Sequence, residues 1–147
     1  MVELVPSLLR QELARLAEES ERIDGRGQWD TREVSLETNC LYNAEGSAKV
    51  VMGGTVVYAG VKFELRTPWP DRPTQGSLMC GAELRPVAGR KYEPGPPSPE
   101  SIELGRVVDR GIRESGCIDM ESLCIVPGEK VWGVMIDIHV MSDQGNI

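Results

Sequence analysis

The chain has 147 residues, of which 40% are hydrophobic and 27% charged, and this balance is typical of a single globular domain with a buried core. Its net charge of −7 argues against a protein that coats nucleic acid with a broad basic surface, so any anion site has to be local. No run of eighteen apolar residues occurs, and charges interrupt the N-terminus early, which predicts a cytoplasmic chain without membrane span or signal peptide.

The first predicted element is an amphipathic helix at residues 6–20, because Leu9 and Leu13 recur on one side between charged positions. We expect residues 1–21 to form this N-terminal helix as an element distinct from residues 22–147. A charged, glycine-containing turn follows the helix.

A β-hairpin gives the clearest strand signal. Residues 47–52 and 55–65 flank Gly53-Gly54, a two-residue connection of the kind that primed hairpin turns require. Before it, residues 32–38 predict a half-buried strand, with a turn at residues 43–46. The second arm of the hairpin places these apolar residues on one face: Val57, Ala59, Val61, Phe63 and Leu65.

More strands are predicted after the hairpin. A proline-rich loop at residues 67–76 leads to a strand at residues 77–84, and further strands are predicted at residues 123–126 and 131–141. The last strand has a wholly apolar face, made of Trp132, Val134, Ile136, Ile138 and Val140. So long an apolar face requires a covering layer, which one helix and an N-terminal arm supply only in part.

The best-marked helix begins after Ser98, which suits an N-cap, and Pro99 suits the first helical position. Gly116 is placed to end it. Apolar residues at spacings of three and four predict that one side faces a core: Leu104, Val107, Val108 and Ile112.

Three arginines, Arg106, Arg110 and Arg113, recur on another side of this helix. Like charges at this spacing repel one another, so the row needs a compensating partner. One interpretation is local ion pairing, in the pairs Glu103–Arg106, Asp109–Arg113 and Arg110–Glu114. The other is an external anion, since guanidinium groups match phosphate oxygens. The residues alone favour local pairing.

Other residues give weaker indications of chemistry. Asp137 and His139 lie two apart on a predicted strand, where a carboxylate orients an imidazole for base catalysis, but no nucleophile accompanies them and a structural role is favoured. The four cysteines lack C-x-x-C spacing and are interpreted as reduced, buried thiols: Cys40, Cys80, Cys117 and Cys124. The sequence contains no motif for a metal ion or a cofactor, and we predict neither.

Read together, many short motifs resemble the first half of an RNase PH-type domain, most closely that of the non-catalytic RNase PH-like subunits of archaeal RNA exosomes. In the first part of the chain they are Arg22-x-Asp24-Gly25-Arg26, Ala44–Ala48, Ala59-Gly-Val-Lys62, Pro70-Asp71, Gln75-Gly76 and Glu83-Leu84. In the second part they are Glu93–Pro97, Glu103-Leu104, Arg106–Ser115, Lys130-Val-Trp132 and Gly145-Asn146.

The resemblance implies an α+β fold of the RNase PH-like, ribosomal-protein-S5-like type: a mixed sheet with a long helix packed on it and an N-terminal helix. In that family the non-catalytic subunit pairs with a catalytic RNase PH-like sister, and three such pairs close a hexameric ring that carries RNA-binding cap subunits. The ring degrades single-stranded RNA from its 3′ end by phosphorolysis. The non-catalytic subunit contributes helix arginines that hold RNA, a role that the matching motif transfers to Arg106 and Arg110, with Arg113 as a weaker third.

Two departures bear on catalysis. The family's second half, with its phosphate-binding loop and acidic catalytic residues, has no counterpart here, so we expect half a domain without catalytic residues. Gly60-Val-Lys62 and Glu93–Pro97 replace elements of the active sister, which also favours the inactive subunit.

We therefore expect a non-enzymatic subunit that positions RNA. The alternatives are a phosphorolytic 3′-to-5′ exoribonuclease in its own right, using Asp137 or His139, and a protein-interaction scaffold without RNA contact.

Overall fold

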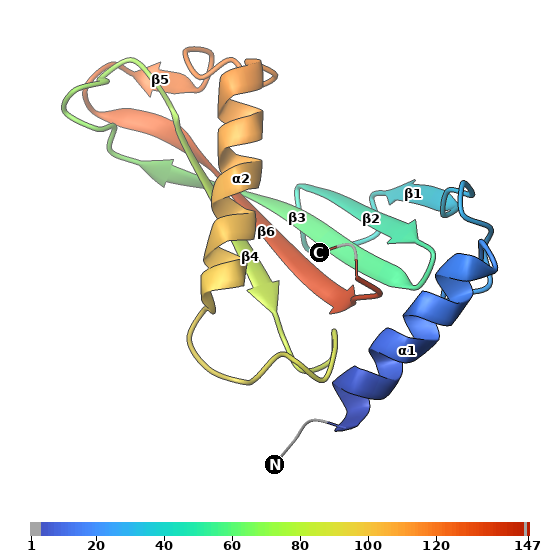
Figure 1. Ribbon diagram of the computed structural model, residues 1–147. Coiled ribbons are helices and arrows are strands. Elements are labelled where there is room, and N and C mark those ends of the chain that lie inside the picture. The colour runs from blue at the N-terminus through green and yellow to red at the C-terminus, as the bar shows by residue number, and fades with distance from the viewer. Residues whose placement is uncertain (1–3, 146) are drawn as a thin grey trace. The chain divides into compact units, whose positions relative to one another are not determined.

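The computed structural model describes residues 4–145 and residue 147 (Figure 1). Residues 1–3 of the predicted N-terminal element and Asn146 of the Gly145-Asn146 motif lie outside this part. The chain forms two compact units, residues 1–33 and residues 34–147, which are described separately. No helix among the described residues is long and apolar enough to cross a membrane.

The first unit contains helix α1, Leu4–Glu18, which confirms the predicted N-terminal helix. Arg15 stabilises it through ion pairs with Glu12 and Glu19, at 2.7 and 2.8 Å. The exposed fractions of Leu9 and Leu13 are 46% and 44%, so the apolar side of the helix remains partly open to solvent.

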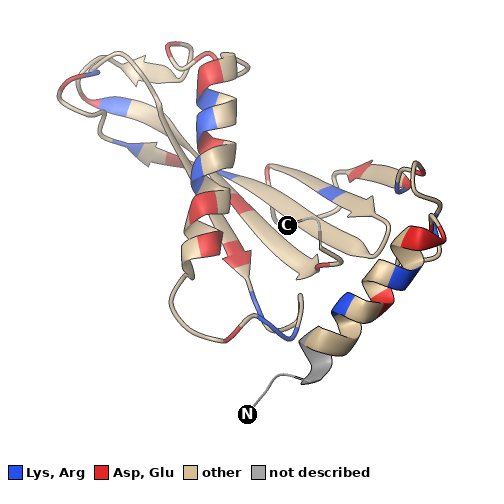
Figure 2. Ribbon diagram, viewed as in Figure 1, with Lys and Arg blue, Asp and Glu red and all other residues tan. Residues whose placement is uncertain are grey.

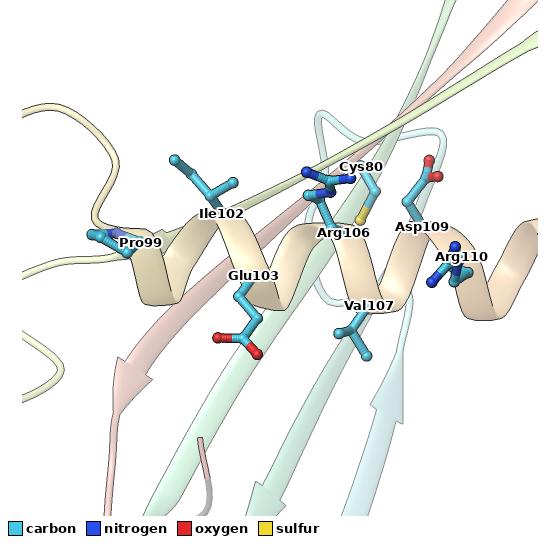
Figure 3. Close-up of a pocket in the computed structure, with 8 residues that line it drawn as sticks. All are labelled: Cys80, Pro99, Ile102, Glu103, Arg106, Val107, Asp109 and Arg110. Carbon is cyan, nitrogen blue, oxygen red and sulfur yellow. The ribbon is translucent and has the colours of Figure 1, made fainter.

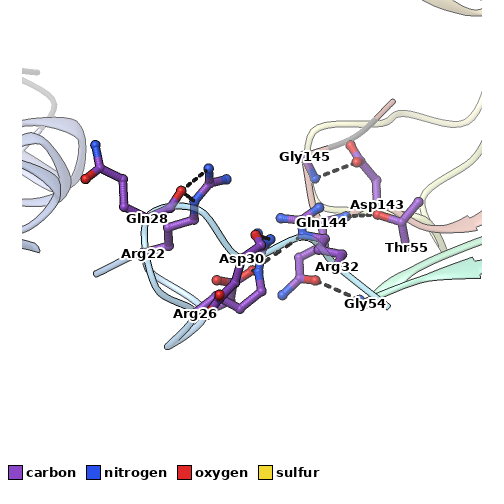
Figure 4. Close-up of polar contacts among 11 residues, drawn as sticks. Arg22, Arg26, Gln28, Asp30, Arg32, Gly54, Thr55, Asp143, Gln144 and Gly145 are labelled. Atoms are coloured by element: carbon purple, nitrogen blue, oxygen red, sulfur yellow. Dashed lines mark hydrogen bonds and ion pairs between the residues drawn. The ribbon is translucent and has the colours of Figure 1, made fainter. Parts of the chain in front are cut away.

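Charged side chains of the loop after α1 form hydrogen bonds within the loop itself (Figure 4). Arg22 Nη2 donates to the carbonyl oxygen of Gln28 at 2.8 Å, and Arg26 Nε donates to Asp24 Oδ2 at 2.9 Å. Gly25 has a φ of 77°, which favours glycine. Burial by itself raises the pKa of Asp24, but the hydrogen bond and charge of Arg26 outweigh it, so that the pKa lies below its usual value.

The second unit is a mixed six-stranded sheet with helix α2 packed on it (Figure 1). Its strands follow the order β1-β2-β3-β6-β4, with β5 paired to β6. All pairs are antiparallel except β4 and β6, which run parallel and are connected through α2. The elements are β1 Val34–Thr38, β2 Gly46–Met52, β3 Thr55–Arg66, β4 Ser77–Leu84, α2 Pro99–Ser115, β5 Cys124–Val126 and β6 Lys130–Ser142.

The predicted hairpin is formed by β2 and β3, where Met52 pairs with Thr55 across the two glycines. Gly53 has a φ of 58°, as a primed turn requires at its first central position. Gly54 N donates to Gln144 Oε1 at 2.7 Å, so the turn is tied to the segment that follows β6 (Figure 4).

One face of the sheet is apolar, and α2 covers only part of it. Val134, Ile138 and Val140 of β6 are buried, as the alternating pattern predicted. Farther across the same face, in β1 and β3, the exposed fractions are 66% for Leu36 and 56% for Leu65. The expectation of incomplete cover is therefore confirmed within this unit.

Three burial predictions were wrong, and one of them, Val107, is described below with helix α2. The strand at residues 34–38 exists, but all its residues are exposed rather than half-buried, because it is the edge strand farthest from α2. The four cysteines are free thiols, as predicted, but none is fully buried: Cys117 is exposed because it lies beyond the end of α2, and Cys40, Cys80 and Cys124 are half-buried.

Candidate nucleic-acid interface

Helix α2 carries the predicted arginine row, and its ends are fixed as the sequence predicted. Ser98 Oγ accepts a hydrogen bond from Ser101 N at 3.3 Å, and Pro99 begins the helix. Gly116 ends it in the left-handed conformation, with a φ of 65°. Because these caps fix both ends of the helix, they also fix the position of each arginine along it.

The buried side of α2 is formed by small residues. Ser101 and Gly105 are buried, and a Cβ on Gly105 would lie 3.3 Å from the Cys80 carbonyl oxygen and 3.4 Å from Ala82 N. The helix backbone therefore lies very close to β4. The prediction that Val107 faces the core was wrong: it is 63% exposed, because the contact line runs through Ser101 and Gly105 instead.

Arg113 is held by the protein itself. Its Nε and Nη2 donate to the two carboxylate oxygens of Asp109, at 3.1 and 2.9 Å, as the sequence predicted. Nη2 also donates to the carbonyl oxygen of Leu78 in β4, at 3.0 Å. These bonds connect α2 to β4 and use three of the five N–H donors of the guanidinium group, so Arg113 is less available to an external anion than Arg106.

Arg106 behaves differently. It is exposed, and among the described residues it forms no ion pair, so the predicted Glu103–Arg106 pair was wrong. In Figure 3 the two side chains point apart: Arg106 extends towards Cys80, whereas Glu103 points away from Cys80.

Arg110 has only a loose partner. Its Nε lies 4.0 Å from Glu114 Oε1, and the two side chains are 82% and 73% exposed. Such an exposed pair contributes little and is readily exchanged for another anion. Figure 2 shows acidic residues towards both ends of α2 and basic residues mostly between them.

A shallow surface cavity of about 710 Å³ lies along this side of the helix, lined by Cys80, Ile102, Arg106, Asp109 and Arg110 among others (Figure 3). Burial raises the pKa of the Cys80 thiol, and the nearby carboxylates Asp109 and Asp137 raise it further. Cys80 therefore stays protonated. The charged side chains that line the cavity are the cations Arg106 and Arg110 and the carboxylates Glu103 and Asp109, of which Asp109 is bonded to Arg113.

The Asp137 and His139 pair is placed on the opposite face of the sheet, away from α2. His139 Nδ1 lies 3.4 Å from Glu83 Oε2 of β4, so Glu83 is its carboxylate neighbour. The described residues place no serine or cysteine hydroxyl or thiol in hydrogen-bonding contact with this imidazole.

Sequence reasoning missed Asp143, whose carboxylate is only 2% exposed. Its Oδ2 accepts from Lys91 Nζ at 2.7 Å and from the Tyr92 hydroxyl at 2.8 Å, and its Oδ1 accepts from Gly145 N at 2.7 Å. Burial by itself raises the pKa of Asp143, but these donors hold it far below its usual value. The spacing Asp-x-Gly, typical of an Asx turn, is the signal that was available.

The fold agrees with comparisons to known proteins. The 3′ exoribonuclease family, domain 1, matches residues 30–147, and the chain belongs to this family. The predicted RNase PH-like fold, with its mixed sheet and long helix, is confirmed.

The particular similarity is to exosome components. The chain is 50% identical over 147 residues to exosome complex component Rrp42 of Methanosarcina acetivorans, covering 100% of this chain and 55% of that protein. It is 51% identical over 129 residues to Rrp42 of Archaeoglobus fulgidus, covering 88% of this chain and 50% of that protein. The chain thus spans about half the length of the curated relatives it matches.

A solved structure described as the Archaeoglobus fulgidus exosome with RNA bound to the active site contains a similar chain. Its TM-score is 0.90 at 46% identity, over 98% of this chain and 57% of that one. An archaeal exosome core gives a TM-score of 0.80 at 44% identity, over 95% of this chain and 52% of that one.

Proposed function

We propose that this chain serves as a non-catalytic subunit of an archaeal RNA exosome. In this proposal it pairs with a catalytic RNase PH-like subunit in a hexameric ring, three pairs to a ring, beneath RNA-binding cap subunits. It holds single-stranded RNA while the partner degrades it from the 3′ end by phosphorolysis. Residues 1–21 serve as an N-terminal helix and residues 22–147 as the first half of the RNase PH-like domain. The similarity to Rrp42 proteins over half their length supports the assignment.

The observation that supports the proposed RNA contact is a difference among the three arginines of α2 in how they are bonded to the protein. Arg106 is exposed without an ion pair among the described residues, and Arg110 has only a partner at 4.0 Å. They stand one helical turn apart on the same side of α2. Arg113 is already bonded to Asp109 and Leu78, so we assign it a minor part in RNA contact.

Two guanidinium groups at this spacing are suited to bind phosphate groups of a single RNA strand. Contacts to phosphate oxygens hold RNA without reading its sequence, as a degradative complex requires. With a net charge of −7 the chain is not basic overall, so the proposed contact depends on individual arginines and not on a general attraction of the surface.

The test is the double variant R106E/R110E, reconstituted with a catalytic RNase PH-like subunit. We expect binding of fluorescent oligouridylate to weaken at least tenfold at low salt. The slope of log affinity against log salt should also fall by about 1.4, because each lost single-strand phosphate contact contributes about 0.7. Phosphate-dependent release of nucleoside diphosphates should slow in parallel.

The matched control is R72E/R90E, which changes the net charge equally at exposed positions outside α2. It should leave affinity and salt slope nearly unchanged, and light scattering should show the same ring for both variants. Equal RNA affinity for R106E/R110E and the control would favour a scaffold without RNA contact. Nucleoside diphosphate release by the chain alone would instead favour the enzymatic alternative.

A further inference from the structure

One acidic side chain, Asp109, lies among the arginines that line the surface cavity of α2. In Figure 3 Arg106 and Asp109 leave the helix on the side of Cys80. Asp109 stands three residues after Arg106 and one residue before Arg110. A strand whose phosphates contact the two arginines therefore passes close to this carboxylate.

A carboxylate beside bound phosphates ordinarily weakens binding, because like charges repel. Arg113 offsets this charge: its Nε donates to Asp109 Oδ2 at 3.1 Å, and its Nη2 donates to Oδ1 at 2.9 Å. Nη2 also donates to the carbonyl oxygen of Leu78 at 3.0 Å, which anchors Arg113 on β4. The carboxylate is thus neutralised as a pair and held in one orientation.

The Asp109 carboxylate keeps capacity for a further donor. An ionised carboxylate has about four lone-pair sites, and Arg113 occupies one site on each oxygen. The Asp109 side chain is 27% exposed, and among the described residues it has no other hydrogen bond or ion pair. A ligand in the cavity can therefore donate to the remaining lone pairs.

The chemistry of a nucleic-acid strand identifies this donor. Phosphate oxygens only accept hydrogen bonds, and the donors of the bases differ from one nucleotide to the next. The ribose 2′-hydroxyl is the donor that every nucleotide of RNA carries, and it distinguishes RNA from DNA. Arg106 and Arg110 cannot make this distinction, because DNA offers them the same phosphates. An acceptor beside the two arginines can make it.

We propose that Asp109 accepts a hydrogen bond from a ribose 2′-hydroxyl of the bound strand, so that the cavity of α2 selects RNA over DNA. Arg106 and Arg110 hold the phosphates, and Arg113 keeps the carboxylate in place. This proposal rests on the RNA contact proposed for α2 and specifies which sugar that contact accepts.

The first test changes the ligand. The complex with a catalytic RNase PH-like subunit is titrated without inorganic phosphate, so that the strand is not degraded. The probes are fluorescent oligouridylate and the same strand with 2′-fluoro or 2′-deoxy sugars. Fluorine keeps the sugar close to its ribose conformation but cannot donate a hydrogen bond. We expect the ribose strand to bind at least about fivefold more tightly than either of the others, because they lack a hydrogen bond to a charged acceptor.

The second test removes the acceptor. D109A should lower the ratio of ribose to 2′-fluoro affinity to less than about twofold. The loss of one negative charge affects both strands alike, so its general electrostatic effect cancels in this ratio. The bond from Arg113 to the Leu78 carbonyl does not involve Asp109, and α2 therefore keeps this contact with β4. Circular dichroism reports whether the fold is retained.

The matched control is E37A, which removes one carboxylate from β1, the edge strand farthest from α2. It should keep the full ratio of the unchanged complex. The ligand series on the unchanged complex does not depend on any variant, so the proposal can fail even if D109A is poorly folded.

Equal affinity of the unchanged complex for the ribose and 2′-fluoro strands would overturn the proposal. A ratio that is as high in D109A as in E37A would also overturn it, and Asp109 would then serve only to hold Arg113. If R106E/R110E still weakened RNA binding in that case, the RNA contact of α2 would stand and only the sugar selection would fail. If R106E/R110E bound RNA as the R72E/R90E control does, both proposals would fail together.

Discussion

Strand β6 carries one aspartate in its middle and is followed directly by another, and the two lie in opposite environments. Asp143 is 2% exposed and accepts hydrogen bonds from Lys91, Tyr92 and Gly145. Asp137, six residues earlier, is exposed and among the described residues has no such donor. A carboxylate surrounded by hydrogen-bond donors joins two segments of the chain, whereas a carboxylate without donors is available to another molecule.

The arginines of α2 repeat this contrast. Arg113 bonds to Asp109 and to the backbone of β4, while Arg106 stands exposed without an ion pair among the described residues. Residue type is the same in both comparisons, so the environment alone separates structural charges from those that can meet a ligand.

The largest expected effect is at Asp143. The substitution D143A removes the acceptor of several hydrogen bonds and leaves Tyr92 without its partner, so the free energy of unfolding should fall by about 2–3 kcal/mol. Urea denaturation followed by circular dichroism measures it. D137N is the control and should change stability by less than about 0.5 kcal/mol; an equal loss in both variants would contradict the comparison.

The same contrast should appear in the dependence of stability on pH. Because the folded-state pKa of Asp143 is depressed, its contribution is complete above the unfolded-state pKa, about 3.9, and is lost as the pH falls further. D143N should flatten the decline of the urea midpoint between about pH 4 and pH 2. D137N should retain the decline of the unchanged chain; a D143N profile as steep as that would argue against the assignment.

A smaller effect is expected in α2. R113M breaks the bonds to Asp109 and to the Leu78 carbonyl and should lower the free energy of unfolding by about 1 kcal/mol. R106M and R110M should each change it by less than about 0.5 kcal/mol, since exposed charges contribute little. Thermal unfolding of the three variants ranks them, and a larger loss in R106M would show that this side chain has a structural partner.

The smallest effect on stability is expected at the uncovered part of the apolar face. The double variant L36T/L65T should change the free energy of unfolding by less than about 1 kcal/mol. It should reduce self-association measured by sedimentation at high protein concentration, because exposed apolar surface drives association. V87T, at an exposed position in a loop, is the control; equal association in both variants would exclude this face as the contact.

Local signals predicted the elements well. The cap at Ser98 and the stop at Gly116 predicted α2 correctly, and Gly53-Gly54 located the hairpin. Helix caps and hairpin turns depend on residues that are neighbours in sequence, so the sequence alone is enough to predict them.

Orientation and pairing were harder to predict. Val107 fits an apolar stripe, yet it is exposed because the helix contacts β4 through Ser101 and Gly105. Helical spacing also permits a Glu103–Arg106 pair that does not form, since the two side chains point apart (Figure 3). Both outcomes depend on where the helix lies across the sheet, which spacing within one segment does not determine.

The Asp143 contacts were missed for a related reason. Lys91 and Tyr92 are 52 and 51 positions away in sequence, and they meet the carboxylate only because the loop after β4 returns to the end of β6. The resemblance to a known family supplied the arginines of α2, whereas it contained no indication of Asp137 as an unpaired charge.

Gly105 gives the arrangement of α2 a narrow tolerance. A methyl group at position 105 would lie 3.3–3.4 Å from backbone atoms of β4. Even alanine in place of Gly105 therefore requires the helix or the strand to move by a few tenths of an ångström. If helix α2 tilted as a rigid body, Arg106 and Arg110 would both be displaced together. In the proposed function, the accuracy with which these two arginines meet an RNA strand would therefore depend on the absence of a side chain at Gly105.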